Sequence, residues 1–194
     1  MEDKAVLANI PYYNNPSRKR FAREKGLNYL QKYSSPNRAV FLNPDGRIDI
    51  AYRGSTTGSD WYNNVFGLGD ITDPLNLKKD PQEPFDRDPD FVDDRKTIRR
   101  IRDEYPDNKI DHLGHSRGGS RARSGFYTDP NREMSNVYTF NTAYTPNEME
   151  KYKDYKVAYP DAITNYRTKK DLVSGSLPKD ESIEIDSKSQ PLRS

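Results

Sequence analysis

The sequence contains no cysteine. Disulfide bonds are therefore excluded, and a small secreted protein that depends on such bonds is disfavoured. The first residues, Met1 to Val6, lack the basic stretch and apolar run of a secretory signal peptide. Because no other run is long and apolar enough to span a bilayer, we expect no transmembrane segment. These absences favour an intracellular or assembly-embedded protein, for which any contact with lipid would be peripheral.

Hydrophobic residues are also scarce. They make up 32% of the 194 residues, and the mean hydropathy is −1.12. With 14 tyrosines and 14 prolines, much of the apolar area must come from aromatic rings and a few short strands. The length suits one domain with a substantial core. We expect a single domain over residues 1–178, with long polar loops, and a polar tail over residues 179–194.

Neither sign of charge dominates, since 32 lysines and arginines stand beside 30 aspartates and glutamates. The balance lacks the basic signature of a nucleic-acid-binding protein, so no nucleic-acid partner is expected. The segment Ser17–Lys25 is the local exception, because basic residues crowd the start of an expected helix. A solvated outer face explains this segment most simply, and contact with an anionic partner such as a lipid surface is the alternative.

The pattern of apolar and turn residues predicts helices and strands in alternation. We expect helices over residues 16–33 and 91–105, a hairpin over 39–52 and strands over 135–140, 161–166 and 182–185. Residues 63–90 are rich in proline and charge and are expected to form a long loop, either a lid or an ordinary surface loop. Alternation of this kind indicates an α/β fold with a mostly parallel sheet flanked by helices.

The stretch Lys109–Ala122 carries the strongest signal. Apolar residues predict a short strand, and the later glycines let a helix pack closely behind it. Ser116 lies on the turn between them, inside the pattern Gly114-x-Ser116-x-Gly118. The pattern is typical of the nucleophile elbow of serine hydrolases, where glycines flank the serine because side chains would block the turn. The structural alternative is that the glycines serve only the packing of strand and helix.

Four blocks occur in order along the chain: Ile50–Ser55 with Asp60–Trp61, then Gly114–Gly119, Val137–Phe140 and Asn165–Val173. Together they resemble class 3 lipases, the fungal triacylglycerol-lipase type of α/β hydrolase, of which relatives also occur in plants and large DNA viruses. The resemblance covers about residues 39–173 and depends on the combination, since each block alone is weak. It implies an α/β-hydrolase fold and hydrolysis of lipid esters. No metal cluster is visible in the sequence, and no organic cofactor is implied.

The same resemblance implies roles for individual residues. Ser116 looks like the nucleophile and Asp171 like the acid of the catalytic triad. Ser55 occupies the family's oxyanion-hole position, and the backbone N–H of Arg117 would be the second donor. Purely structural alternatives exist for two of them: Asp171 as a helix cap or a partner of Arg167, and Ser55 as a turn residue.

The chain departs from the family at the catalytic base. The family's base is a histidine that follows the acid, but no histidine follows Asp171 in this sequence. His115 is adjacent to Ser116, and its side chain should point away from the reacting face of the turn. His112 lies four residues upstream on a strand, roughly 13 Å away, which is beyond hydrogen-bond reach. Neither histidine is expected to act as the base.

Three explanations stay open for this departure. The sequence is part of a longer active enzyme, or it is an inactive copy kept for binding or architecture. In the third explanation the base comes from another chain or from a lysine such as Lys169 or Lys170, which is less favoured because a surface lysine is charged at neutral pH.

Two functions follow from the sequence. The first is a lipase- or esterase-like serine hydrolase acting on lipid esters, impaired where the histidine is missing. The second is a catalytically inactive lipase-fold structural or interaction protein with assembly partners, for example a component of a virus particle. Its location would be the cytoplasm or such a particle.

Three arginines, Arg117, Arg121 and Arg123, follow Ser116 on the expected helix. They either pair with acids such as Asp103 or Asp129 or face a protein partner.

Overall fold

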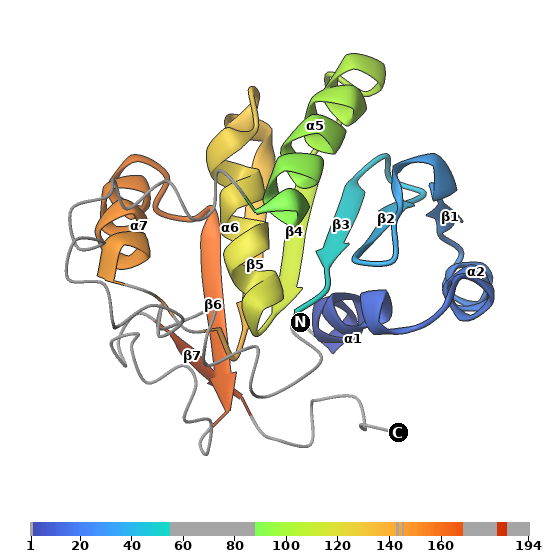
Figure 1. Ribbon diagram of the computed structural model, residues 1–194, viewed down its shortest axis with the longest axis horizontal. Coiled ribbons are helices and arrows are strands. Elements are labelled where there is room, and N and C mark those ends of the chain that lie inside the picture. The colour runs from blue at the N-terminus through green and yellow to red at the C-terminus, as the bar shows by residue number, and fades with distance from the viewer. Residues whose placement is uncertain (1, 55–87, 143, 145, 169–181, 186–194) are drawn as a thin grey trace.

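Seven strands form one sheet in which their order in space is their order along the chain (Figure 1). The computed structural model describes residues 2–54, 88–142, 144, 146–168 and 182–185. The strands are β1 (Asn28–Tyr29), β2 (Arg38–Leu42), β3 (Ile48–Tyr52), β4 (Ile110–His115), β5 (Ser135–Phe140), β6 (Ile163–Thr168) and β7 (Ile183–Ile185). Strands β1 to β3 pair antiparallel, and every later pair is parallel. The expected α/β fold with a mostly parallel sheet is confirmed.

The expected hairpin is present as β2 and β3. Its turn closes through a hydrogen bond from the Gly46 N–H to the Asn43 carbonyl, with Gly46 at φ 86°. Only glycine adopts such a value without steric cost, which explains the Pro-Asp-Gly sequence of the turn. Alternate residues of β3 then face opposite sides of the sheet.

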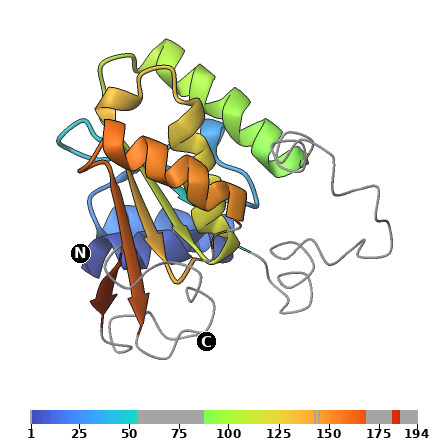
Figure 2. The same ribbon diagram turned by 90° about the vertical axis from the view of Figure 1, so that its left-hand side faces the viewer.

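The helices cover both faces of the sheet (Figures 1 and 2). One face carries α1 (Glu2–Asn9), which contacts β3, β4 and β5. The other face carries α5 (Pro89–Glu104) and α6 (Arg117–Thr128), with α7 (Pro146–Ala158) beside α6. The remaining helices are α2 (Asn15–Glu24) and the short 3₁₀ turns η1 (Ile10–Tyr12), η2 (Gln31–Tyr33) and η5 (Arg132–Met134).

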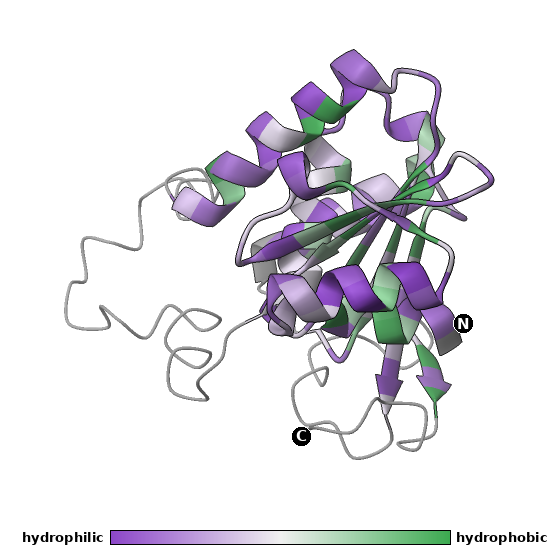
Figure 3. Ribbon diagram, turned by 90° about the vertical axis from the view of Figure 1, so that its right-hand side faces the viewer, coloured by the Kyte–Doolittle hydropathy of each residue, from purple (hydrophilic) through white to green (hydrophobic). Residues whose placement is uncertain are grey.

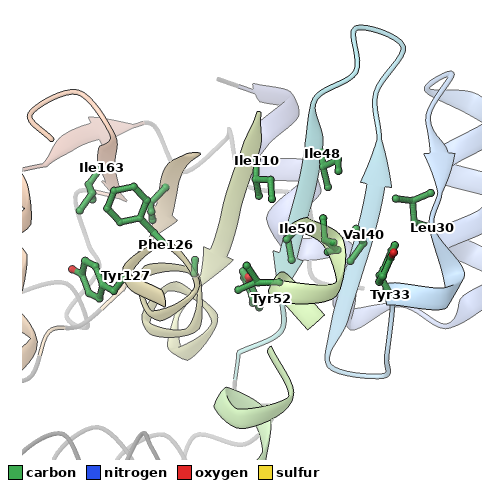
Figure 4. Packing of buried hydrophobic residues seen from close by; sticks show 14 of the residues in the cluster. Leu30, Tyr33, Val40, Ile48, Ile50, Tyr52, Ile110, Phe126, Tyr127 and Ile163 are labelled. Carbon is green, nitrogen blue, oxygen red and sulfur yellow. The ribbon is translucent and has the colours of Figure 1, made fainter. Parts of the chain in front are cut away.

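Each face of the sheet has its own hydrophobic cluster. On the α6 side, Val40, Ile50 and Ile110 of the strands pack with Phe126 of the helix (Figure 4). On the α1 side the strands contribute Phe41, Ala51 and Leu113, among others. Hydrophobic positions therefore gather on the strands between the layers, while the outer surfaces of the helices are largely hydrophilic (Figure 3). The protein thus forms a hydrophobic core between its layers although its composition is polar.

The helix expected over residues 16–33 is wrong in its second half. Helix α2 ends at Glu24, and Gly26 then adopts φ 67° while the Leu27 N–H bonds to the Ala22 carbonyl. This is the ending that a left-handed glycine imposes on a helix. At its other end the helix is capped by Asn14, whose side chain accepts a hydrogen bond from the Ser17 N–H.

The other expected elements are largely present. Strands β5 and β6 and helix α5 lie where the pattern placed them, whereas α1 and α7 were not predicted. The edge strand expected over 182–185 is β7, so the sheet extends into the range assigned to the polar tail. The boundary at residue 178 stays a prediction. Of the loop expected over residues 63–90, the part from 63 to 87 lies outside the described residues. No helix in the described ranges is long and apolar enough to cross a membrane.

Candidate functional site

The carboxyl ends of β3, β4, β5 and β6 meet at one edge of the sheet, because these four strands run parallel (Figure 1). In open parallel sheets this edge is where ligands bind. Strand β4 is central, and the chain passes from its last residue, His115, through Ser116 into α6. The strand–turn–helix expected around Ser116 is confirmed.

Ser116 has a backbone conformation that is rare for any residue except glycine. Its φ is 56° and its ψ is −131°, and the residue is half-buried. The conformation is held by hydrogen bonds on both sides, from the Ser116 N–H to the Phe140 carbonyl (3.0 Å) and from the Gly119 N–H to the Ser116 carbonyl (2.9 Å). Among the described residues, the Ser116 side chain makes no capping bond to the helix. Such strain costs about 1–3 kcal/mol and persists only where the surroundings enforce it.

The flanking glycines are required by contact. A Cβ on Gly114 would lie 2.0 Å from the Gly118 carbonyl oxygen, and one on Gly118 would lie 2.2 Å from the Tyr52 carbonyl oxygen. Both neighbours are backbone atoms, which cannot move aside without displacing a strand or a helix. A Cβ on Gly119 would similarly overlap Thr142, in the loop after β5. The glycines thus let α6 start directly behind β3 and β4.

The chain after β3 approaches the same turn. A Cβ on Gly54 would lie 2.6 Å from both the His115 carbonyl oxygen and the Tyr12 hydroxyl. The Gly54 N–H donates to this hydroxyl at 3.0 Å. The structure therefore places the residue that precedes Ser55 against the turn, while Ser55 itself lies outside the described residues. The sequence did not place Tyr12 at this site, since 42 residues separate it from Gly54.

The backbone N–H of Arg117 belongs to the first turn of α6. The N–H groups of a first turn have no acceptor within the helix, and the positive end of the helix dipole lies there as well. Beside the turn, Asn141 at the end of β5 has φ 47° and joins β6 by two hydrogen bonds. Its N–H donates to the Tyr166 carbonyl, and its side chain accepts from the Thr168 N–H. Asp171, three residues further on, lies outside the described residues.

Both histidines of the sequence lie in β4, and their side chains belong to opposite faces of the sheet. His112 is fully buried on the α6 face, where Nδ1 lies 2.9 Å from the Tyr52 hydroxyl. A Cβ on Gly125, two turns along α6 from Ser116, would lie 2.8 Å from the same Nδ1. His115 belongs to the opposite face, with its ring centroid 6.5 Å from that of Tyr12. The expectation that neither acts as the base stays a prediction.

His112 belongs to a buried polar network. Its Nε2 lies 3.8 Å from a carboxylate oxygen of Asp129, which accepts a forked pair of hydrogen bonds from Arg102 (2.9 and 2.8 Å). Burial alone would raise the pKa of Asp129, but the nearby His112 and the hydrogen bonds from Arg102 and Ser135 outweigh it and lower the pKa. Burial raises the pKa of the Tyr52 hydroxyl well above its ordinary value. The network joins β3, β4 and α5 to the end of α6.

The arginines of α6 are partnered within the protein. Arg121 is 1% exposed and forms a forked pair with Asp94 of α5 (2.7 and 2.8 Å). Arg123 is also buried, bonds to Glu148 at 2.8 Å and lies over the ring of Tyr144, 3.7 Å from its centroid.

Arg117 pairs with Asp88 and Asp90, at the start of α5. Burial opposes ionisation of Asp90, yet the charges of Arg121 and Arg117 and a hydrogen bond from Asn37 lower its pKa. The partners suggested from the sequence were wrong: Asp129 pairs with Arg102, and Asp103 is exposed. A surface for a protein partner is not needed to explain these arginines.

No group of three or more metal-ligating side chains occurs in the part of the chain that the structure describes. Among the described residues, the edge of the sheet offers the hydroxyl of Ser116, the backbone donors around it and the positive end of the α6 dipole.

The fold has known counterparts among solved structures. The native Rhizomucor miehei lipase–propeptide complex matches with a TM-score of 0.58 at 16% identity, over 97% of this chain and 68% of that one. The triacylglyceride lipase of the same fungus matches with a TM-score of 0.58 at 15% identity, over 96% and 79% of the two chains. The likeness is one of fold. No protein-family model matches the sequence, and no curated protein is similar to it in sequence.

Proposed function

We propose that the chain is a lipase-like serine hydrolase of the α/β-hydrolase type, which acts on lipid esters with Ser116 as its nucleophile. One observation carries the proposal: Ser116 has the strained conformation of φ 56° and ψ −131° at the end of the central strand, between Gly114 and Gly118. Backbone strain of this kind lowers stability, and it is concentrated at functional sites, where the strained geometry is part of the mechanism. The likeness in fold to a fungal lipase supports the same reaction class.

The reaction would be acyl transfer through a covalent intermediate. The Ser116 Oγ attacks the ester carbonyl carbon while its proton passes to a base, and the carbonyl oxygen becomes an oxyanion. The backbone N–H of Arg117, at the positive end of α6, and the donor of Ser55 would hold this oxyanion. The alcohol then leaves with a proton, and water releases the acid from Ser116. Asp171 would orient the base.

We expect transfer of the Ser116 proton to limit the rate, because neither histidine is expected to act as the base. His112 is buried against Tyr52, and His115 faces Tyr12 on the other side of the sheet. Loss of one member of a catalytic triad costs several orders of magnitude, while oxyanion stabilisation and binding leave residual catalysis. We therefore expect slow turnover from this chain alone.

The position of the two histidines also favours a second candidate, a catalytically inactive lipase-fold structural or interaction protein. In this candidate the strained serine is retained from an active ancestor. Membership of a virus particle would belong to this candidate.

Hydrolysis of p-nitrophenyl esters of short and medium chain length separates the candidates. The wild-type protein should release p-nitrophenol slowly but above background, and Ser116→Ala should reduce the rate to background. Ser124→Ala, which removes a half-buried hydroxyl two turns along α6, serves as the matched control and should retain the rate. A folded wild-type protein with no activity above background would favour the inactive candidate.

A further inference from the structure

The structure has a pocket of about 460 Å³ between η1, the start of α2 and the end of β3, next to the candidate site. Its walls come from the turn between η1 and α2, from the segment around β1 and η2, and from Arg53 at the end of β3. Tyr12, in its wall, accepts the hydrogen bond from Gly54, and Gly54 in turn contacts the His115 carbonyl that precedes Ser116. One layer of residues thus separates the pocket from the serine turn.

Among the described residues, the pocket is lined by two arginines and by no acidic residue. Arg18 is only 2% exposed, and its guanidinium donates five hydrogen bonds, all to backbone carbonyls rather than to carboxylates. All five N–H groups of the side chain are used in this way. The positive charge of Arg18 is therefore fixed in place and not neutralised by a neighbouring carboxylate. Its burial also corrects the expectation that Arg18 is part of a solvated basic face.

Arg53 is the second arginine in the wall of the pocket. Its Nε is buried, and among the described residues it has no hydrogen-bond partner. Its guanidinium lies over the ring of Tyr12, 5.6 Å from the centroid. A buried polar group without a partner is costly, and a guanidinium matches the geometry of phosphate and carboxylate oxygens.

Helix α2 adds to the positive potential of the pocket. Asn14 and Asn15, at its N-terminus, line the pocket, so the positive end of a ten-residue helix faces the same space. The phenol rings of Tyr13 and Tyr29 supply apolar walls with hydroxyl groups, and Tyr13 is 41% exposed. The volume exceeds that of a single ion and suits a group of the size of a polar head group.

We infer that this pocket binds the phosphate group of an anionic ligand, with Arg53 as the direct donor and Arg18 as a fixed charge. Resting on the proposed function, the ligand is a phosphorylated lipid ester. Its head group would occupy the pocket while its ester reaches Ser116 over Gly54. The pocket then selects anionic substrates over neutral ones.

Calorimetric titration of Ser116→Ala tests the inference without interference from hydrolysis. The probes are glycerol 3-phosphate, inorganic phosphate and glycerol. Glycerol 3-phosphate should bind, Arg53→Gln should weaken its binding roughly tenfold or more, and glycerol should not bind. Arg20→Gln, an exposed arginine of α2 whose side chain is 68% accessible, is the control and should leave the binding unchanged.

The two phosphate probes identify the source of the anion. If glycerol 3-phosphate binds more tightly than inorganic phosphate, the pocket recognises a head group. If the two bind equally, the anion site is supported but its ligand is free phosphate. The inference is overturned if glycerol binds as tightly as glycerol 3-phosphate. It is also overturned if Arg53→Gln leaves the affinity for glycerol 3-phosphate unchanged. Because binding is measured without Ser116, ester hydrolysis without phosphate binding rejects only the pocket, and phosphate binding without hydrolysis rejects only the proposed enzyme.

Discussion

Gly118 and Tyr52 approach so closely that a Cβ on residue 118 would lie 2.2 Å from the Tyr52 carbonyl oxygen. The contact joins the first turn of α6, which follows Ser116, to the end of β3. Gly118→Ala must displace one of these backbones, and we expect it to lower the free energy of unfolding by about 3 kcal/mol or to prevent folding. Urea denaturation measures the change.

Gly26→Ala is the matched control for this substitution. Gly26 has φ 67°, and beyond its chain neighbours no atom of the described residues lies within 4 Å of a Cβ built there, so the substitution mainly adds backbone strain. The expected cost is about 1 kcal/mol. A Gly118→Ala protein no less stable than Gly26→Ala would contradict the close approach.

Asp94 holds two buried arginines, Arg121 of α6 and Arg38 of β2. Asp94→Asn leaves both positive charges buried with weaker acceptors, and we expect a loss of about 3–5 kcal/mol in the free energy of unfolding. The exposed pair Arg20–Glu24, with 3.9 Å between its charged atoms, provides the comparison, and Glu24→Gln should cost no more than about 0.5 kcal/mol. Equal effects of the two substitutions would show that Asp94 does not anchor the helix.

His112 is a structural residue in this account. His112→Asn retains a polar atom near the Tyr52 hydroxyl but loses ring packing, so we expect a loss of about 1–3 kcal/mol in stability. The rate of ester hydrolysis per folded molecule should not change, because the ring lies two helical turns from Ser116 along α6. A tenfold loss of rate in a protein of unchanged stability would instead make His112 part of the reaction.

The stability contributed by Asp129 should depend on pH. Its pKa in the folded protein is below the ordinary 3.8, so the ionised carboxylate favours folding. This contribution is complete above about pH 5 and is lost as the pH falls through 3.8 toward the folded-state pKa. The difference in unfolding free energy between the wild type and Asp129→Asn should therefore be largest at neutral pH and shrink in acid.

The exposed residue Asp107 gives the control for this pH series, since Asp107→Asn should change stability little at any pH. A difference for Asp129→Asn that stays constant from neutral to acidic pH would contradict the lowered pKa.

Local patterns predicted the parts of the fold that depend on neighbours in the chain. The hairpin needed only a turn sequence between two apolar runs, and the bend at Ser116 needed only flanking glycines. The predicted helix extended beyond the end of α2 because the apolar spacing continues past Gly26. At Gly26 the backbone is left-handed, and the helix ends there. Glycine is compatible with either outcome, so the pattern alone did not decide.

Contacts between distant segments were not predictable in the same way. Arg18 and Arg121 are charged residues that a sequence pattern assigns to the surface, and the structure buries both among acceptors from other elements. The contact of Tyr12 with Gly54 joins a 3₁₀ turn near the N-terminus to the end of β3. Neither residue type nor spacing signals such a pairing, because it follows from how the sheet is covered.

Reaction with a fluorophosphonate probe, followed by peptide mass spectrometry, tests the central claim most directly. The probe reacts with an activated serine hydroxyl and leaves a stable mass increment on the residue. The account predicts the increment on the peptide that contains Ser116 and its loss in Ser116→Ala, with Ser124→Ala labelled like the wild type. Labelling of a different serine, or no labelling of a protein shown to be folded, would contradict it.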